Sequence, residues 1–204
     1  GQQTNVIYAA MIESMDESVG RILQKLDELK LTEKTVVIFT SDNGGLVTSE
    51  GPNTPPTINA PLREGKGWLY EGGIRVPLLA RWPGVIPAGS TNATPVSSAD
   101  YFPTLLELAG GKPSPNELLD GVSLAPLLAR TGELPARSLY WHYPHYANQR
   151  SKPAGAIRDG DYKLIEFYET GRVELFDLQH DLSENQNLAE DPAQSAIRDI
   201  ALHL

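Results

Sequence analysis

The sequence predicts an α/β protein: part of a large mixed or parallel sheet domain flanked by helices, followed by a small antiparallel sheet with a helix. Three observations lead to this prediction. Residues 6–30 carry the apolar repeat of a long amphipathic helix, and residues 35–40 form an unbroken apolar, β-branched run. Residues 138–178 then contain several short segments typical of antiparallel strands, separated by Asp-Gly and Thr-Gly turns. A helix that leads by a short turn into a buried strand indicates an α/β sheet.

The helix at residues 6–30 is the clearest element. Charged and amide side chains, such as Glu13 and Lys25, occupy one face, and apolar side chains recur on the other at steps of three and four residues. This spacing predicts a single amphipathic helix. Its apolar stripe consists of Tyr8, Met11, Ile12, Met15, Val19, Ile22, Leu23, Leu26 and Leu29.

Two strands of the larger domain are predicted after this helix. The run at residues 35–40 shows no alternation, which is typical of a parallel strand covered on both faces. Residues 76–81 form a second apolar run, in which Pro77 favours an edge position or a place near the start of the strand. The connecting residues 44–64 and 83–98 are rich in Gly, Pro, Asn and Thr, and loops this long are usually functional or disordered.

Two helices follow in the same domain. Residues 101–108 are preceded by Asp100, a residue type that commonly caps a helix N-terminus, and are followed by Gly110. A shorter helix is predicted within residues 118–128, after an Asp-Gly turn.

Beyond residue 131 the pattern changes to short strands joined by tight turns. We predict these strands at residues 139–143, 156–158, 162–168 and 172–178. A helix is expected to begin at residue 192 and to continue to residue 204. The chain is therefore divided into residues 1–130, the C-terminal part of an α/β domain, and residues 131–204, a small subdomain of antiparallel strands and a helix.

The composition excludes several classes of protein. The net charge is -9, whereas binding to nucleic acid or to an anionic membrane requires a basic surface. The sequence contains no cysteine, so disulfides, thiolate metal sites and a cysteine nucleophile are excluded within it. No apolar run approaches the roughly 18 residues of a membrane span. We therefore expect neither a nucleic-acid nor a membrane partner.

Asp42 and Asn43 follow the run at residues 35–40, at the end where open α/β sheets bind their ligands. The carboxylate of Asp42 and the amide oxygen of Asn43 are hard donors suited to Ca²⁺ or Mg²⁺. The glycines that follow allow the sharp turn that directs both oxygens to one point. Asp-Asn-Gly is also ordinary turn chemistry that needs no metal, so these residues alone leave both interpretations open.

Lys66 lies between two glycines in the run from residue 63 to residue 77. A lysine in this setting can extend its ammonium group toward an anion while backbone N–H groups also approach that anion. The alternative is a solvent-exposed lysine in a flexible loop, and Gly-Lys-Gly alone favours that alternative.

The two segments together favour a functional site. Residues 41–44 read Ser-Asp-Asn-Gly, and residues 65–77 read Gly-Lys-Gly-x-x-Tyr-Glu-Gly-Gly-x-Arg-x-Pro. This combination after an apolar strand resembles the arylsulfatase family of the alkaline-phosphatase superfamily. The resemblance extends over nearly the whole chain, through residues 8–16, 100–110, 120–124 and 156–165.

The resemblance implies a function and a set of roles. In similar sulfatases, the pair matched by Asp42 and Asn43 holds one Ca²⁺ together with two aspartates from an N-terminal strand. The lysine matched by Lys66 contacts the substrate sulfate. Glu71 is expected to support the loop that contains Lys66, whereas Arg75 is expected to be structural. The resemblance also implies a periplasmic or secreted protein.

The family's nucleophile is a formylglycine made from Cys or Ser in a Cys/Ser-x-Pro-x-Arg motif. The nearest spacings in this sequence, at residues 59–63 and 133–137, begin with Asn and Glu. We therefore expect the nucleophile to lie upstream, in an N-terminal part of the same protein, and the 204 residues alone to be inactive.

Two histidines are weaker candidates for substrate binding. Strand alternation places His142 on the same face as Tyr140 and places Trp141 and Tyr143 on the opposite face. His145 lies beyond the strand, in a loop whose aromatic, amide and cationic side chains suit a polar sugar. The alternatives are a hydrogen-bonded core histidine at His142 and a merely solvated loop around His145.

The sequence therefore predicts a Ca²⁺-dependent sulfuric ester hydrolase that acts on a carbohydrate or aryl sulfate. A phosphomonoesterase or phosphonate hydrolase of the same superfamily is the first alternative, because the metal scaffold is shared. A non-catalytic, Ca²⁺-stabilised binding module is the second alternative.

Overall fold

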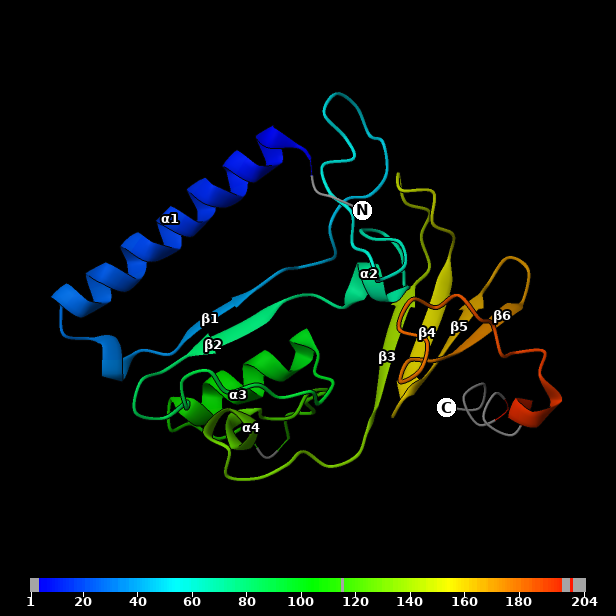
Figure 1. Ribbon diagram of the computed structural model, residues 1–204. Coiled ribbons are helices and arrows are strands. Elements are labelled where there is room, and N and C mark those ends of the chain that lie inside the picture. Colours follow the sequence, from blue (N-terminus) through cyan, green and yellow to red (C-terminus); the bar gives the residue numbers. More distant parts are fainter. Residues whose placement is uncertain (1–3, 115, 196–198, 200–204) are drawn as a thin grey trace. The chain divides into compact units, whose positions relative to one another are not determined.

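The computed structural model describes residues 4–114, 116–195 and 199 (Figure 1). By their contacts these residues form two compact units. The first unit combines the described residues of segments 1–19, 40–78 and 137–204, and the second combines segments 20–39 and 79–136. The predicted division of the sequence at residue 130 concerns the domains of a larger protein and stays a prediction.

Helix α1 (Val6–Glu28) confirms the predicted amphipathic helix to within two residues. The Asn5 side chain caps it by accepting a hydrogen bond from the Tyr8 N–H at 2.9 Å. None of its residues is buried, and Met11 and Ile22 leave 63% and 59% of their surface exposed. The apolar stripe of α1 is therefore only partly covered in the described part of the chain, where Tyr8, Val19, Leu23 and Leu26 are half-buried. No described helix is long and apolar enough to cross a membrane.

Strands β1 (Val37–Thr40) and β2 (Leu78–Arg81) form a two-stranded sheet, and Figure 1 shows that they run in opposite directions. Pro77 directly precedes β2, as expected for a residue that cannot donate a ladder hydrogen bond. The predicted parallel strand, covered on both faces, is not realised among the described residues. The described partner of β1 is antiparallel, and all four β1 residues are half-buried.

The second unit also contains helices α3 (Tyr101–Leu108) and α4 (Ala125–Ala129). The α3 prediction is confirmed, but the Asp100 side chain does not cap α3; it completes the capping box of a preceding 3₁₀ turn (Ser98–Asp100), whose N-cap is Ser97. The buried Asp100 carboxylate accepts hydrogen bonds from the Ser97 N–H and the Val122 N–H, at 2.8 and 2.9 Å. The predicted helix at 118–128 is therefore shorter, because its first residues form the turn that binds Asp100.

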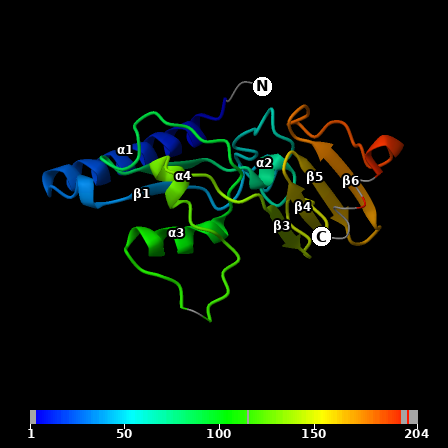
Figure 2. The same cartoon turned by 90° about the horizontal axis from the view of Figure 1, so that it is seen from below.

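The first unit is built on a four-stranded antiparallel sheet of order β3-β4-β5-β6 (Figure 2). The two tight hairpin turns, at residues 160–161 and 168–171, each contain a glycine with positive φ, Gly160 at 57° and Gly171 at 63°, as the turn chemistry predicts. All four predicted strands are confirmed with small changes at their ends. Their bounds are β3 Ser138–Tyr143, β4 Ala154–Asp159, β5 Tyr162–Phe167 and β6 Arg172–Asp177.

The two faces of this sheet carry separate hydrophobic clusters. One cluster contains Ile165, Phe167 and Phe176, with Tyr70 from the loop that contains Lys66 packed among them. The other cluster, on the opposite face, contains Ile157, Leu164, Leu175 and Ala189. The sheet is therefore covered on both faces, and a segment that lies far away in the sequence, around Tyr70, contributes to one of them.

Only the start of the helix predicted from residue 192 to residue 204 lies in the described part of the chain. Residues Pro192–Gln194 form a 3₁₀ turn, which Asp191 caps by accepting a hydrogen bond from the Ala193 N–H at 2.9 Å. Residues 196–198 and 200–204 lie outside the described part of the chain.

The first cluster gives a test of the fold. Ile165 is 1% exposed, and we expect Ile165→Ala to lower the free energy of unfolding by about 2–5 kcal/mol, because it leaves a cavity in the core. The matched variant Ile165→Val should cost about 0.5–1.5 kcal/mol. Urea unfolding followed by tryptophan fluorescence measures both changes, since Trp68 and Trp141 pack against this cluster. Equal stabilities for the two variants would contradict the assignment of Ile165 to a close-packed core.

Candidate functional site

The segment after β1 presents Asp42 at the surface. Ser41 donates a hydrogen bond from its hydroxyl to the Asn43 carbonyl at 2.8 Å, which closes a tight turn directly beyond the strand. Asp42 is exposed and Asn43 is half-buried. Among the described residues, no cationic group lies within ion-pair distance of Asp42, so its carboxylate remains open to an external cation.

The next two residues, Gly44 and Gly45, join this segment to the lysine loop by backbone hydrogen bonds. The Gly44 N–H donates to the Gly73 carbonyl at 2.9 Å, and the Lys66 N–H donates to the Gly45 carbonyl at 3.1 Å. A Cβ on Gly44 would lie 1.7 Å from the Gly72 carbonyl oxygen. Glycine is therefore required by the close approach of the two backbones, and the structure brings Lys66 next to the Asp42-Asn43 segment.

Asn59 fixes the same junction, a role that its place in the sequence does not predict. Its side-chain amide donates to the carbonyls of Gly45 and Glu64, both at 2.9 Å, and lies 3.3 Å from the carbonyl of Gly72. An asparagine in a Pro- and Thr-rich loop carries no local signal for this role, because the three carbonyls come from two other segments.

The lysine loop, residues 63–72, closes on itself. The Gly72 N–H donates to the Arg63 carbonyl at 2.8 Å, and the Trp68 N–H donates to the Gly65 carbonyl at 3.0 Å. Lys66 lies inside this loop and is exposed. No carboxylate among the described residues lies within ion-pair distance of its ammonium group, so Lys66 can bind an anion from solution.

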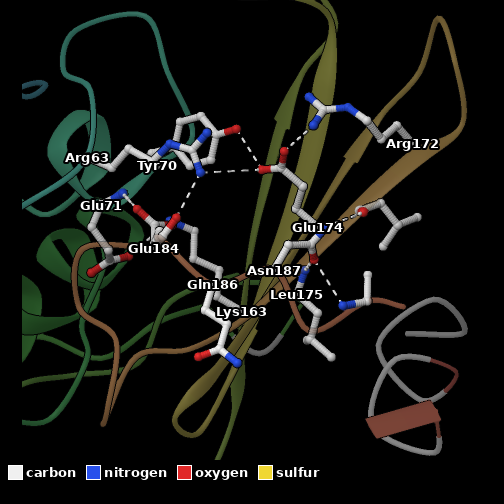
Figure 3. Close-up of polar contacts among 12 residues, drawn as sticks. Arg63, Tyr70, Glu71, Lys163, Arg172, Glu174, Leu175, Glu184, Gln186 and Asn187 are labelled. Atoms are coloured by element: carbon white, nitrogen blue, oxygen red, sulfur yellow. Dashed lines mark hydrogen bonds and ion pairs between the residues drawn. The ribbon is translucent and has the colours of Figure 1, made fainter. Parts of the chain in front are cut away.

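A buried ion cluster lies beneath the end of the lysine loop (Figure 3). The Lys163 ammonium lies 3.0 Å from a carboxylate oxygen of Glu71 and 2.9 Å from one of Glu184. All three side chains are almost fully buried. Arg75 lies 3.3 Å from Glu71, at the surface. Glu71 therefore supports the lysine loop as expected, through partners that lie 92 and 113 residues away in the sequence.

A second group of polar contacts extends this cluster across the sheet (Figure 3). Tyr70 donates a hydrogen bond from its hydroxyl to Glu174 at 2.6 Å, and Arg172 pairs with the other oxygen of Glu174. The Arg63 guanidinium lies 4.0 Å from the centre of the Tyr70 ring, a cation–π contact. Both ends of the lysine loop are therefore bound to the C-terminal sheet.

Burial changes the acidity of two groups in these clusters. Desolvation raises the pKa of the Glu184 carboxyl above its ordinary value, and the attraction of Lys163 opposes that shift. Burial, and then the hydrogen bond to Glu174, raise the pKa of the Tyr70 hydroxyl. Tyr70 therefore stays protonated and acts as a hydrogen-bond donor.

The loop at residues 144–152 lies beside the lysine loop. The indole N–H of Trp68 donates to the Gln149 carbonyl at 3.1 Å, and a Cβ on Gly67 would lie 2.7 Å from the side-chain oxygen of Gln149. His145 is exposed, with its ring edge-on to that of Tyr143 at 5.5 Å. The structure therefore brings the loop that contains His145 next to Lys66.

His142 takes a different position. It is exposed, which excludes the alternative of a core histidine, and its Nδ1 lies 2.8 Å from the Tyr168 hydroxyl. Trp141, on the other face of β3, packs against the cluster that contains Tyr70. The structure therefore places His142 on the sheet face opposite to the lysine loop.

The pocket between the lysine loop and the sheet is too small for a substrate. Its volume is about 10 Å³, which is close to the space of one water molecule. Trp68, Tyr143 and Ser151 are among its lining residues, and the buried Ser151 hydroxyl has no hydrogen-bond partner among the described residues.

Among the described residues, no group of three or more His, Cys, Asp or Glu side chains is arranged to hold a metal. Asp42 and Asn43 nevertheless fit a shared Ca²⁺ site chemically, because both provide hard oxygen ligands at one open strand end. Ca²⁺ takes about 6–8 oxygen ligands, so further ligands would have to come from outside this pair.

Two family models match the chain. The sulfatase model matches residues 4–111, and the model described as N-sulphoglucosamine sulphohydrolase, C-terminal, matches residues 65–203. A sulfatase of Formosa agariphila is 41% identical over 222 aligned residues, which cover 100% of this chain and 39% of the relative. Human arylsulfatase A is 39% identical over 205 aligned residues, which cover 89% of this chain and 38% of that protein.

Solved structures share the fold. The crystal structure of Ps i-CgsB in complex with k-i-k-neocarrahexaose has a TM-score of 0.83 and 28% identity, and the match covers 100% of this chain and 42% of that one. The phosphonate monoester hydrolase of Agrobacterium radiobacter has a TM-score of 0.70 and 29% identity, and the match covers 95% of this chain and 38% of that one.

The chain thus spans about two fifths of the length of the curated relatives it matches. The family models cover almost all of its residues, and the motifs that include Asp42, Asn43 and Lys66 lie within them. The chain belongs to the sulfatase family.

Proposed function

We propose that the protein containing this chain hydrolyses a sulfate ester of a carbohydrate or an aryl compound. The main support is one structural observation: two loops, one presenting Asp42 and Asn43 and the other presenting Lys66, are held together by backbone hydrogen bonds at 2.9 and 3.1 Å. An exposed carboxylate that can hold a cation and an exposed ammonium that can bind an anion thus lie in adjoining segments. Membership of the sulfatase family supports sulfate as that anion.

In this proposal Lys66 binds oxygens of the sulfate group and stabilises the charge that develops on them during displacement. Asp42 and Asn43 provide two of the oxygen ligands of a Ca²⁺ ion. When bound, Ca²⁺ would act as a Lewis acid that polarises the sulfate oxygens. The activated nucleophile, a formylglycine in similar enzymes, would come from a part of the protein outside these residues.

The loop at residues 144–152 supports a carbohydrate as substrate. It contacts the lysine loop through Gln149, and it carries exposed aromatic, amide and cationic side chains. Tyr146 donates a hydrogen bond to Glu169 at 2.5 Å, and Lys152 pairs with the same carboxylate at 3.4 Å, so the loop has fixed polar contacts. Ps i-CgsB, whose fold is shared, was solved with an oligosaccharide. We propose that His145 contacts the sugar beyond the sulfate.

A phosphonate monoester hydrolase is the second candidate function. It is favoured by the structural similarity to the Agrobacterium radiobacter enzyme, which covers 95% of this chain. Sulfate and phosphonate monoesters both present tetrahedral oxyanions, and Lys66 could bind either of them. Turnover of an aryl sulfate and of an aryl phosphonate monoester with the same phenol leaving group, by the same purified protein, would separate the two functions. Turnover of neither substrate would favour a Ca²⁺-stabilised binding module.

Lys66 should be needed for turnover and not for folding. We expect Lys66→Ala, in the full-length protein, to lower kcat on an aryl sulfate by about 10²–10³-fold, the usual cost of removing one group that stabilises an oxyanion. The melting temperature should change little, because Lys66 is exposed. Lys112→Ala, at another exposed lysine, is the control and should leave kcat unchanged. A large drop in melting temperature with normal turnover would show that Lys66 is structural.

Asp42 should determine the dependence on Ca²⁺. Removal of Ca²⁺ by a chelator should abolish turnover, and added Ca²⁺ should restore it. We expect Asp42→Ala to raise the Ca²⁺ concentration needed for half-maximal turnover by about tenfold or more, because the variant loses a charged ligand. The exposed Asp161→Ala serves as the control. Full activity in the chelated enzyme would refute the metal assignment.

His145 should affect large substrates selectively. We expect His145→Ala to raise KM on a sulfated oligosaccharide by about fivefold, which corresponds to the loss of one hydrogen bond of about 1 kcal/mol. The kcat on a small aryl sulfate should be unchanged, since the contact is remote from the reacting centre. His180→Ala, an exposed histidine that pairs with Asp177, is the control. A loss of kcat on both substrates would instead place His145 at the sulfate.

A further inference from the structure

Glu184 contacts both ends of the lysine loop (Figure 3). Its main-chain carbonyl accepts a hydrogen bond from the Arg63 guanidinium at 2.8 Å. Its carboxylate accepts a hydrogen bond from the Glu71 N–H at 2.7 Å. Because Arg63 and Glu71 stand on either side of Lys66 in the loop, one residue holds the positions at which the loop begins and ends.

Glu184 is itself held firmly. It is fully buried, and its second carboxylate oxygen lies 2.9 Å from the Lys163 ammonium. Its backbone has a φ of 53°, an uncommon conformation for a residue with a side chain, and its N–H donates to the Asp181 carbonyl at 3.1 Å. The surrounding turn therefore determines this conformation.

The segment that contains Glu184 is also attached to the sheet. Asn187 accepts a hydrogen bond from the Leu175 N–H at 2.9 Å, and the Leu188 N–H donates to the Leu175 carbonyl at 2.8 Å. Through these contacts Asn187 and Leu188 attach their segment to the outer edge of β6. The sheet and the lysine loop belong to the same unit. Glu184 thus links a rigid sheet to a loop rich in glycine.

The lysine loop needs such a link, because glycine residues can adopt a wider range of backbone conformations than other residues. Gly65, Gly67, Gly72 and Gly73 all lie in or next to the loop. The lack of a side chain at Gly65 permits the close approach to the Gly45 carbonyl. The Lys66 N–H and the Asn59 side chain hold the middle of the loop by hydrogen bonds, and contacts at the two ends of the loop add to them in determining the position of Lys66.

We propose that Glu184 is a positioning residue, which fixes the lysine loop through Arg63 and Glu71 so that Lys66 is preorganised beside Asp42 and Asn43. The inference rests on the proposed function for its kinetic consequence. Its structural part, that Glu184 holds the loop, is independent of what Lys66 binds. Glu184 acts through the loop and does not contact the substrate itself.

The structural part is tested by hydrogen exchange and mass spectrometry on the full-length protein. We expect Glu184→Ala to speed exchange in peptides covering residues 63–72 by about tenfold or more beyond any increase in peptides from β4 and β5, which report the loss of stability of the sheet itself. Glu190→Ala, at an exposed acidic residue of the same segment, should change neither. Unchanged exchange in residues 63–72 would overturn the inference, whether or not the protein hydrolyses sulfate esters.

The kinetic part is tested by a double-mutant cycle with Lys66. We expect Glu184→Ala to lower kcat/KM on an aryl sulfate by about 10–100-fold, as for a misplaced catalytic group. In a Lys66→Ala background the same change should cost less than about threefold, because a residue that acts only through Lys66 has nothing left to position. The full loss in both backgrounds would show a general structural role and overturn the inference.

A milder variant covers the case in which Glu184→Ala unfolds the sheet. Arg63→Met removes the hydrogen bond from the Arg63 guanidinium to the Glu184 carbonyl. The Arg63 side chain is 37% exposed, so the fold should tolerate this substitution better than Glu184→Ala. We expect the same changes in exchange and kinetics, with smaller size. No change in either measurement for Arg63→Met would overturn the inference. A wild-type protein without sulfatase activity would refute the proposed function alone, because the exchange measurement still decides whether the loop is held.

Discussion

The arrangement of the first unit depends on one buried interaction, the Lys163 ammonium between the carboxylates of Glu71 and Glu184. An ammonium group removed from water is stable only when its charge is compensated and its hydrogen bonds are made. Lys163 lies in the middle of the C-terminal sheet, and Glu71 lies at the end of the lysine loop. The compensation of one charge therefore requires the loop and the sheet to pack together. Removing one partner of a buried pair typically costs about 3–5 kcal/mol, so this requirement is strong.

A second constraint is geometric and acts where the loop meets the segment that follows β1. There the two backbones approach so closely that a Cβ on Gly44 or Gly65 would lie 1.7 or 2.2 Å from a carbonyl oxygen of the facing segment. The buried charges of Glu71, Lys163 and Glu184 attach the loop to the C-terminal sheet. The glycine contacts bring the loop against the segment that presents Asp42. Neither constraint involves the exposed side chains that would meet a substrate. The residues proposed to bind a substrate and those that support the loop are thus different residues.

The sequence predicted local structure well and long-range polar contacts poorly. Apolar periodicity predicted α1, the flanking Asp100 and Gly110 predicted α3, and turn glycines at residues 160 and 171 predicted the hairpins, because these signals are contained in neighbouring residues. The motif residues Asp42, Asn43 and Lys66 were found, and the structure brings their segments together, although their roles remain proposals. Lys163 and Glu184 look in the sequence like ordinary surface charges, and only the fold shows that both are buried. The role of Asn59 was not predicted either, because its side chain binds the carbonyl groups of Gly45 and Gly72, which lie 14 and 13 residues away in the sequence.

The dependence of Glu71 on Lys163 and Glu184 also limits how such proteins can recombine. Glu71 lies 92 residues before Lys163 and 113 before Glu184, so a genetic crossover between two relatives near residue 110 separates the glutamate from both partners. If one parent has an apolar residue at any of the three positions, the hybrid inherits a buried charge without compensation. A C-terminal segment exchanged into this chain would therefore need to supply both a lysine at position 163 and a glutamate at position 184 to keep the Glu71 charge compensated.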